Sequence, residues 1–501
     1  MLVRSLAFRK FLSALTLLSL LSAAAVSLPR DEKAIAARIE RVENGLLPPN
    51  VIKGRPLPRM RLADRMKHWN GVPGVSLAVI NDYKIEWARG YGVLGEGSRE
   101  AVTPETLFQA GSVSKPVTAM AVLRLVQQGK LSLDEDVNKK LVSWKVPENE
   151  FTRKEKVTVR RLLSHTAGLN PTSSGDYPVG SEVPTLLQVL EGRKPANTEP
   201  VRAVSVPGGG TSYSGSNYFV LQQLLIDVTG KPFPRLMEEL VFRPLGMNDS
   251  TFEQPLPKSL QERAAAGKQG ATPVEGKWHV KPEMAAAGLW TTPSDLARFA
   301  IEIQKSGRGR SNKVLSREMT NLMLSAPPAS ATAEDGGPGG GMGLGMEFKS
   351  EGGLLRFSHG GYTTGYRCQM TAYEDGRGVV VMTNGSSQAL LREVIWGVAR
   401  EYDWPSGSRP KERVLVDLAP AILEEYAGQY ENPPNRRPAV SSVTVKDNQL
   451  YLDGMRLQPE SESGFFGETE ATYVFVRDDK GRVSEMIYDY GFAKFTARKI
   501  K

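Results

Sequence analysis

The sequence predicts an α+β fold: an antiparallel sheet flanked by helices, with a helix-rich insertion, followed by a small all-β barrel or sandwich. Segments with strand-like apolar alternation lie at 71–93 and again at 343–361 and 365–385. The stretch between them, to about residue 300, is rich in helical periodicity. Strands on both sides of a helical stretch are typical of a single sheet that the two ends of a domain complete together.

Local signals place the elements of the first part. Asn81-Asp82 separates two alternating strands and indicates a hairpin turn. The apolar run from Val117 to Val126 predicts a buried central helix that ends at Gly129, and residues 388–404 predict a last helix. The glycine-rich tract 334–347 neither follows a strand nor opens a helix, which favours a flexible loop entering a strand over a phosphate-binding loop.

Length and composition leave room for a second domain. A chain of 501 residues with 40% hydrophobic content can bury one large core and a second small one. From residue 415 the strands are short, with turns at Asp447-Asn448 and Lys480-Gly481, which predicts the β domain. The predicted order is a signal segment 1–27, a helix and Pro-rich arm 28–60, the α+β domain 61–405, a linker 406–414 and the β domain 415–501.

The first residues have the composition of an export signal. Arg4, Arg9 and Lys10 precede an apolar run from Phe11 that ends in small residues. An uncleaved membrane anchor is the alternative, and no cysteine follows the run that could carry a lipid. The sequence therefore predicts an exported protein, periplasmic or secreted, that meets the membrane only through this segment before cleavage.

Composition argues against several classes of function. The net charge of +9 is spread along the chain, without a basic block interleaved with aromatics, so no nucleic-acid partner is expected. Cys368 is the single cysteine, so no internal disulfide can form, and a buried small apolar role is favoured over a catalytic thiol. The four histidines are too widely spaced for a metal-ligand pair, and we expect neither a metal nor a cofactor.

Ser112 and Lys115 are the leading candidates for chemistry. Residues three apart on a helix share one face, so Lys115 can reach the Ser112 hydroxyl at the start of the central helix. A neutral, buried lysine can take the proton of a serine and turn it into a nucleophile. The spacing alone is weak, because it recurs at Ser408 and Lys411 in the Pro-rich linker, and an exposed serine beside a solvated lysine is the alternative.

Three downstream segments strengthen this interpretation. His165 lies where a helix ends in a Gly168 turn, in "LLSHTAGL", and Tyr213 lies on a turn before another apolar helix. His359 lies on a strand and is followed by Gly360 and Gly361, which let another segment approach the strand edge. Together with "LFQAGSVSKPVTAMAVLRLVQQGKLSLDEDV" and "AAAGLWTTPSDLARFA", the order of these segments resembles the serine β-lactamase and penicillin-binding-protein superfamily.

The resemblance covers about residues 60–405 and is greatest to class C β-lactamase-like serine hydrolases, the peptidase S12 or CubicO-type group. It implies a β-lactamase/transpeptidase-like fold. The tail from about residue 415 resembles the lipocalin-like domain that follows some of these hydrolases. The partner implied is a small-molecule or peptide acyl substrate: an ester, a D-amino-acid peptide or a lactam.

The resemblance also implies roles for single residues. Ser112 would be the acylated nucleophile, Lys115 its base, and Tyr213 the group that relays protons to and from the leaving group. His359, Gly360 and Gly361 would match the Lys-Thr-Gly strand that lines the site. The backbone N–H groups of Ser112 and Tyr362 would form the oxyanion hole.

Two departures from the family pattern shift the expected substrate. The third position of the Tyr-x-Asn element is Gly215, so its amide is missing unless Asn217 substitutes for it. His359 replaces a lysine and removes a fixed cation that could pair with a substrate carboxylate. Both changes favour an esterase or peptidase over an efficient β-lactamase. Tyr213 as a packing residue, His359 as a structural histidine, and a non-catalytic or weakly catalytic cell-wall or penicillin-binding protein on the same fold remain alternatives.

Overall fold

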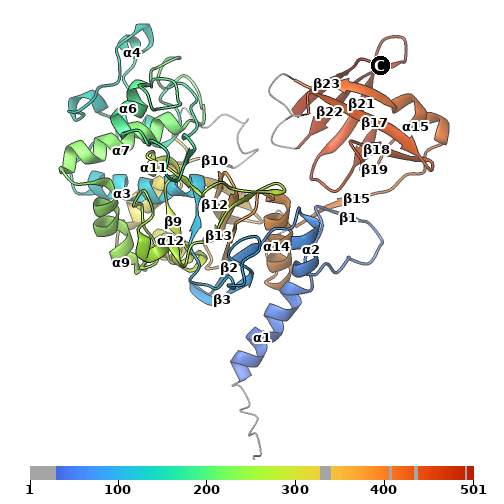
Figure 1. The fold of residues 1–501 in the computed structure, drawn as a ribbon, viewed down its shortest axis with the longest axis horizontal. Helices are drawn as coiled ribbons and strands as arrows, with labels where there is room; N and C mark the ends of the chain where they lie inside the picture. Colours follow the sequence, from blue (N-terminus) through green and yellow to red (C-terminus); the bar gives the residue numbers. More distant parts are fainter. Residues whose placement is uncertain (1–29, 328–339, 406–408, 434–437, 491–493) are drawn as a thin grey trace, which may run out of the picture.

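The structure is a computed structural model of the chain that describes residues 30–327, 340–405, 409–433, 438–490 and 494–501. It has two parts, a large α+β domain and a smaller β-barrel (Figure 1). The predicted signal segment 1–27 lies outside the described residues, as do residues 334–339 of the glycine-rich tract, whose remaining residues form β10 and lead into β11.

The central sheet has the predicted architecture. Its strand order is β10-β11-β12-β13-β14-β2-β3, and every neighbouring pair is antiparallel. β2 pairs with β14, so the segment before the helices and the segment after them complete one sheet, as the sequence predicts. The strands are β2 (Gly74–Asn81), β3 (Lys84–Gly92), β10 (Gly340–Met342), β11 (Glu347–Glu351), β12 (Leu354–Thr363), β13 (Tyr366–Tyr373) and β14 (Gly378–Thr383).

Helices cover both faces of this sheet. On one face, α14 (Gln388–Glu401), α1 (Arg30–Glu43) and α2 (Leu62–His68) pack on Val75, Leu77 and Val79. On the other face, α3 (Ser114–Gln127) and α12 (Pro293–Gly307) share a core with the intervening residues of β2, such as Ala78 and Ile80. Burial on both faces explains why β2 is almost continuously apolar instead of alternating.

The helix-rich insertion lies between β3 and β10. Its three longest helices are α7 (Gly215–Thr229), α12 and the central helix α3, which ends before Gly129 as predicted. The other helical elements are α4 (Glu150–Lys154), α5 (Val159–Leu163), α6 (Leu186–Glu191), α8 (Phe233–Met237), α9 (Arg243–Leu245), α10 (Lys258–Gln261), α11 (Met284–Ala287), α12, α13 (Arg317–Met323), and the short turns Gly111–Val113, Val137–Lys139 and Glu238–Phe242.

Short strands pair within and beside this insertion. Two of the three pairs join segments that are far apart in the chain, whereas β6 and β7 form a local hairpin. The pairs are β4 (Phe108–Gln109) with β9 (Trp290–Thr291), β5 (Tyr177–Pro178) with β8 (His279–Val280), and β6 (Lys268–Gln269) with β7 (Thr272–Pro273).

The first hairpin differs by one residue from the sequence prediction. Asn81 is the last residue of β2 and pairs with Lys84, so the turn residues are Asp82 and Tyr83, with φ values of 51° and 59°. A two-residue turn with both residues in the left-handed region matches the twist of the flanking strands. Tyrosine gives no sequence signal for that conformation, which is why the turn was expected one position earlier.

The second domain is a barrel, not a sandwich. Eight antiparallel strands close on each other, and the Asp447-Asn448 turn between β17 and β18 lies where the sequence places it. Aromatic side chains fill the interior: Tyr426 stacks on Phe475 with ring centroids 4.4 Å apart, and Tyr430 and Phe465 pack beside them. The elements are α15 (Pro420–Tyr426), β16 (Gly428–Glu431), β17 (Val440–Lys446), β18 (Gln449–Leu452), β19 (Met455–Pro459), β20 (Gly464–Phe466), β21 (Thr472–Arg477), β22 (Val483–Asp489) and β23 (Lys494–Lys499).

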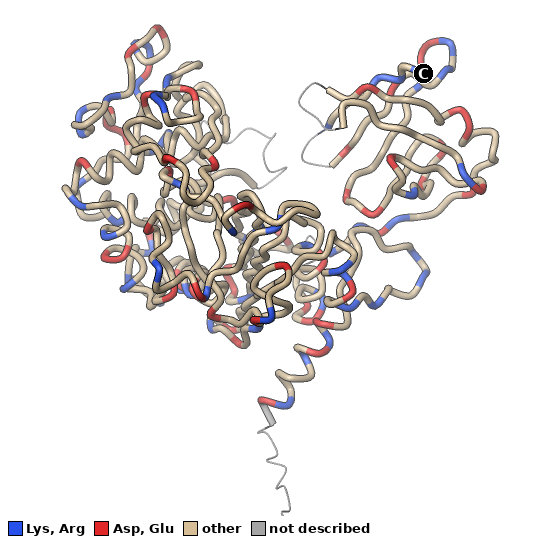
Figure 2. Tube along the Cα trace, in the orientation of Figure 1, with Lys and Arg blue, Asp and Glu red and all other residues tan. Residues whose placement is uncertain are grey.

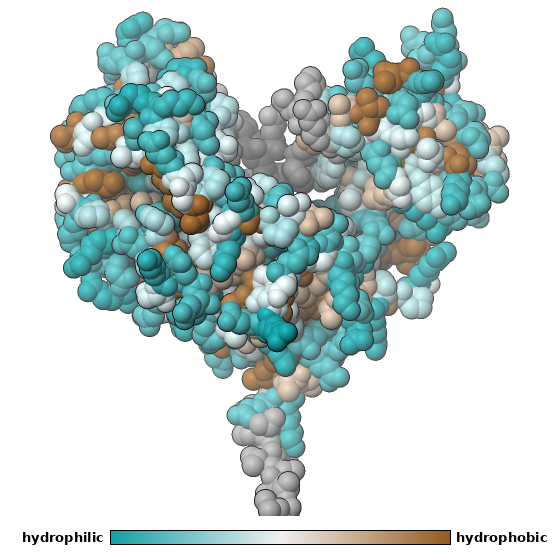
Figure 3. Space-filling view, in the orientation of Figure 1, coloured by the Kyte–Doolittle hydropathy of each residue, from teal (hydrophilic) through white to brown (hydrophobic). Residues whose placement is uncertain are grey.

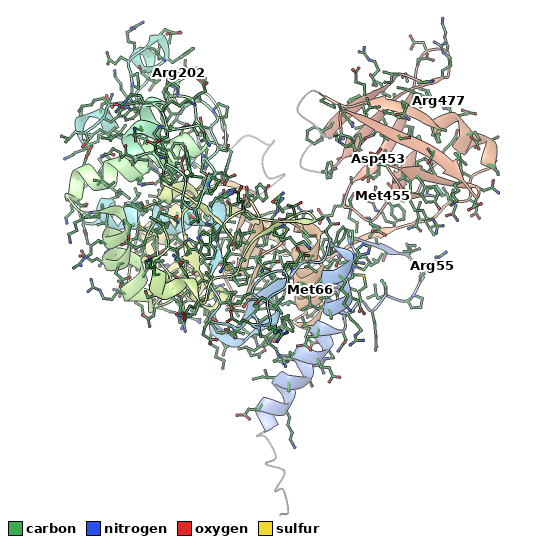
Figure 4. All side chains as sticks on the ribbon, viewed as in Figure 1. Arg55, Met66, Arg202, Asp453, Met455 and Arg477 are labelled. Carbon is green, nitrogen blue, oxygen red and sulfur yellow. The ribbon has the colours of Figure 1, made fainter. Side chains whose placement is uncertain are left out.

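The arm and the predicted linker hold the two domains together. β1 (Asn50–Ile52) from the arm pairs in parallel with β15 (Lys411–Arg413) from the linker. Arg413 then donates to Asn50 Oδ1 (2.8 Å) and to Glu460 Oε2 in the barrel (2.7 Å). In Figure 4, Met66 marks α2 at this junction, and Arg55 marks the loop that follows β1.

Away from this junction the barrel stands apart from the helical part of the first domain, and a hollow separates the two in Figure 3. Lys and Arg alternate with Asp and Glu over both domains in Figure 2, which agrees with the spread of charge in the sequence. Among the described residues, the longest helices have 15 residues, and none is long and apolar enough to cross a bilayer.

A buried ion pair between α2 and α14 gives a test of this packing. Glu393 has a fully buried carboxylate that accepts two hydrogen bonds from Arg65, at 2.7 and 2.9 Å, and one from Trp69 at 3.1 Å. We expect Glu393→Ala to lower the free energy of unfolding by about 3 kcal/mol, because it leaves a mostly buried guanidinium without its counter-ion. Glu401→Ala, which breaks the more exposed pair between Arg41 of α1 and Glu401 of α14, should cause little change. Urea unfolding followed by circular dichroism measures both, and equal effects would contradict the prediction.

Candidate active site

Ser112 lies on a short helical turn, Gly111–Val113, that leads from β4 into α3. Ser114 Oγ fixes this turn, because it donates to Gly111 O (2.6 Å) and accepts from Leu289 N (3.0 Å). Gly111 has a φ of 52°, and a Cβ there would lie 2.6 Å from Tyr362 O. A glycine is therefore required where the turn passes against β12, immediately before the candidate nucleophile.

Lys115 reaches Ser112 from one turn further along. Its Nζ donates to Ser112 Oγ at 3.0 Å and to Ala286 O at 2.9 Å, and the side chain is buried. The same atom lies 5.0 Å from the ring centre of Tyr213 and 5.7 Å from that of Tyr218. The amine is thus held by one carbonyl, by two aromatic faces and by its hydrogen bond to the Ser112 hydroxyl.

Tyr213 packs on His165. Their ring centroids are 4.3 Å apart, and Tyr213 remains 47% exposed while His165 is buried. Nδ1 of His165 accepts hydrogen bonds from Ser214 N (3.2 Å) and from the side-chain amide of Asn217 (2.9 Å), so its proton is carried on Nε2. Burial lowers the pKa of His165 well below its usual value, and Lys115 and His359 lower it further. His165 is therefore a positioning residue: its neutral imidazole packs against the Tyr213 ring.

The structure places Asn217 away from the open side of the site. Asn217 is buried on α7, and its side-chain amide donates to Nδ1 of His165 at 2.9 Å. The N–H of Gly215 donates to Thr172 O at 2.6 Å, and a Cβ on Gly215 would lie 2.5 Å from the same carbonyl. The segment around Thr172 leaves no room for a side chain at position 215.

His359 faces the same cluster from β12. Its ring centroid lies 6.4 Å from that of Tyr213, and Nδ1 donates to Gly360 O at 2.7 Å. Burial lowers the pKa of His359 to about 3, with a further contribution from the charge of Lys115, so the imidazole is neutral near pH 7. His359 thus contributes hydrogen-bonding groups to the site and no positive charge.

The two glycines after His359 let the nucleophile's turn approach the strand. A Cβ at Gly361 would lie 1.9 Å from Ala110 O, which no side chain tolerates. β11 pairs with β12 only from Leu354 to Ser358, so residues 359–363 present their edge toward the turn that carries Ser112. A Cβ built on Gly111 would lie 2.8 Å from Tyr362 N. Ser112 follows Gly111 directly in the chain, so the two proposed oxyanion donors, Ser112 N and Tyr362 N, lie near each other.

Several residues of the site gave no signal in the sequence. Glu283 is fully buried just before α11, the helix whose Ala286 carbonyl binds Lys115, and it accepts from Gly175 N at 3.0 Å. Lys281 donates to Gly175 O (3.0 Å) and pairs with Asp176, which accepts from Thr364 Oγ1 at 2.8 Å. This network joins the 175–176 segment to both α11 and the end of β12. It draws on distant segments, so spacing alone could not reveal it.

Comparisons with known proteins agree with this geometry. The sequence profile of the Beta-lactamase family matches residues 61–402. Penicillin-binding protein 4 of Amycolatopsis lactamdurans is 28% identical over 392 residues, which cover 74% of this chain and 95% of that protein. Protein flp of Staphylococcus aureus (strain N315) is 28% identical over 226 residues, 44% of this chain, and the match spans only 42% of Protein flp.

Solved structures share the fold. The octameric penicillin-binding protein homologue from Pyrococcus abyssi aligns with a TM-score of 0.58 and 22% identity, over 87% of this chain and 98% of that one. D-amino acid amidase from Ochrobactrum anthropi SV3 aligns with a TM-score of 0.53 and 21% identity, over 73% of this chain and 96% of that one.

The fold and the site define a protein of the β-lactamase/transpeptidase class. The chain belongs to the Beta-lactamase family. The sequence-based recognition of this superfamily is therefore confirmed, as is the presence of a C-terminal barrel.

Glu283 gives a pH-dependent stability that can be measured. Burial raises the pKa of Glu283 to about 7, from an ordinary value of 4.5 in the unfolded chain. The folded protein therefore holds this proton more tightly, so the stabilisation is complete below pH 4.5 and is lost as the pH rises through 7. We expect the unfolding free energy of Glu283→Gln, relative to the unsubstituted chain, to rise by about 3 kcal/mol between pH 4 and pH 8.

Glutamine keeps an acceptor for Gly175 N and removes the titration. Asp176, which lies close to Glu283, is present in both proteins, so its own titration largely cancels in the comparison. Urea unfolding at four pH values measures the difference. A difference that does not change with pH would show that folding leaves the pKa of Glu283 at its ordinary value.

Proposed function

We propose that the protein is an exported serine hydrolase that forms an acyl-enzyme on Ser112 and releases the acyl group to water. The contact that carries this proposal is the 3.0 Å hydrogen bond between Lys115 Nζ and Ser112 Oγ, at a place where Tyr213 and His359 also meet. Within the superfamily, the class C-like group of esterases and peptidases is the branch that the sequence motifs favour.

The geometry supports a simple course for acylation. Lys115, in its unprotonated form, takes the proton of Ser112 as the hydroxyl oxygen attacks the substrate carbonyl. The N–H groups of Ser112 and Tyr362 stabilise the charge that develops on the carbonyl oxygen. Tyr213 gives a proton to the leaving group as its bond to the acyl carbon breaks. In the second half, the Tyr213 phenolate takes a proton from the water that attacks the acyl-enzyme ester, and Lys115 returns its proton to Ser112 Oγ as the carboxylic acid leaves.

The substrates that we propose are esters, D-aminoacyl amides or peptides, and lactams. D-amino acid amidase and penicillin-binding proteins are among the similar proteins, which supports acyl groups of this kind. His359 is neutral and Gly215 carries no amide, so neither offers a charge or a donor to a substrate carboxylate. We therefore expect simple esters and amides to be better substrates than β-lactams.

Labelling of Ser112 tests the acyl-enzyme directly. We expect a fluorophosphonate probe to react once per chain with the unsubstituted protein and not at all with Ser112→Ala, because the probe needs an activated serine. Ser408→Ala, in the second Ser-x-x-Lys of the sequence, is the matched control and should label normally. Retained labelling in Ser112→Ala, seen by intact-mass spectrometry, would disprove the assignment.

Lys115→Ala tests the base. Removal of a positioned general base typically costs about 10²–10⁴-fold in rate, so kcat/KM for p-nitrophenyl acetate should fall by about that factor. Lys411→Ala, from the other Ser-x-x-Lys, should leave the rate as it is. If a substrate panel of p-nitrophenyl acetate, nitrocefin and D-alanyl peptides shows no turnover by the unsubstituted protein, a non-catalytic binding protein on this fold is favoured instead.

A further inference from the structure

The exposed aromatic side chains of this protein are concentrated at Ser112. Among the described residues only three aromatic side chains are more than about a third exposed: Tyr213 (47%), Tyr362 (46%) and Phe495 (38%). Phe495 lies on the barrel, and the other two flank the candidate nucleophile. Tyr213 has a place in the proton transfers, whereas the ring of Tyr362 is left without one, since only its backbone is used.

The ring of Tyr362 lies on the opposite face of the sheet from the proton-transfer groups. His359 and Tyr362 are three residues apart on β12, so their side chains point to opposite faces. His359 pairs with Met370, which belongs to the core shared with α3. Tyr362 pairs with Arg367, whose Nε donates to Ser386 O just before α14. The ring therefore lies on the α14 face, beside the strand edge that Ser112 approaches.

Arg367 holds this ring in place. Its guanidinium carbon lies 4.0 Å from the centre of the Tyr362 ring, and its hydrogen bond to Ser386 O measures 3.1 Å. A cation stacked on an aromatic face restricts the rotation of the tyrosine and leaves its other face open. The exposed ring is thus ordered before any ligand arrives, which lowers the entropy lost when a ligand packs against it.

The two faces of the strand edge receive different halves of the substrate. The scissile carbonyl must lie at the edge, between Ser112 and the oxyanion donors. The leaving group must lie on the face of Tyr213 and Lys115, because those groups exchange its proton. The acyl substituent then extends to the other face, where the Tyr362 ring lies.

We propose that the Tyr362 ring, braced by Arg367, is the acyl-side wall of the site and selects acyl groups that carry an aromatic side chain. This inference rests on the proposed function of Ser112. A flat ring in the acyl group can stack on the open face of Tyr362 in an offset or edge-on arrangement, whereas a saturated ring of similar size gains only apolar contact. The preferred substrates are therefore arylacyl esters and amides.

A pair of esters with one leaving group tests the proposal. We expect kcat/KM for p-nitrophenyl phenylacetate to exceed that for p-nitrophenyl cyclohexylacetate, and Tyr362→Ala to reduce this ratio by about tenfold. Tyr362→Phe should keep the ratio, since it retains the ring. Arg367→Met should reduce the ratio by a smaller factor, because the ring remains but is no longer braced.

The chain offers a matched control for the arginine. Arg310 lies 5.0 Å from the ring centre of Tyr83 at the far end of the sheet, so Arg310→Met removes a similar contact away from Ser112 and should not change the ratio. The same variants are also compared on two phenylacetyl esters, one with a phenol and one with ethanol as its leaving group. Tyr362→Ala should lower kcat/KM for both esters by the same factor.

The outcomes separate the two proposals. An unsubstituted protein that is labelled and turns over esters without preferring the phenylacetyl ester overturns the inference about Tyr362 alone. The same holds if Tyr362→Ala keeps the preference, or changes only the dependence on the leaving group. Absence of both fluorophosphonate labelling and turnover would overturn the proposed function, and the inference with it.

Discussion

The position of the Lys115 amine is the constraint on which the rest of the site depends. An amine buried beside α3 loses its hydration, and such a loss is costly unless other groups replace the water. Here Ala286 O and the faces of Tyr213 and Tyr218 replace it, and Ser112 completes the set. These groups come from α11, from the turn before α7 and from α7 itself, so three segments of the helical insertion meet at the Lys115 nitrogen.

This amine also determines the electrostatics of its neighbours. His165 and His359 both lie close enough that its charge, added to their burial, keeps both imidazoles neutral. A second fixed cation at position 359 would be repelled by Lys115 in the same desolvated space, whereas a neutral histidine is not. The replacement of lysine by histidine on β12 is therefore consistent with a site that handles uncharged esters and amides and needs no second positive charge.

The sequence predicts those parts of the fold and site that depend on local order. The sheet, the central helix and the second β domain follow from periodicity, and the close approach of Ser112 to Lys115 follows from helix geometry. The family resemblance supplied Tyr213 and His359, and the structure brings them to the same amine. The orientation of Asn217 could not be predicted, because it depends on a hydrogen bond from its amide to His165, which lies fifty-two residues away in the chain. The Glu283 network and the Arg367 brace likewise join segments whose proximity only the folded chain defines.

The barrel is joined to the first domain through α14 as well as through the pairing of β1 with β15. Its interior is filled by Tyr426, Tyr430 and Phe475, which gives the barrel a packed core like that of any small domain. Glu470 of the barrel pairs with Arg392 of α14. Burial lowers the pKa of Arg392, and the positive charge of Arg367 lowers it further. Glu470 therefore joins the barrel to α14 and places a negative charge beside Arg392, the guanidinium whose pKa Arg367 lowers.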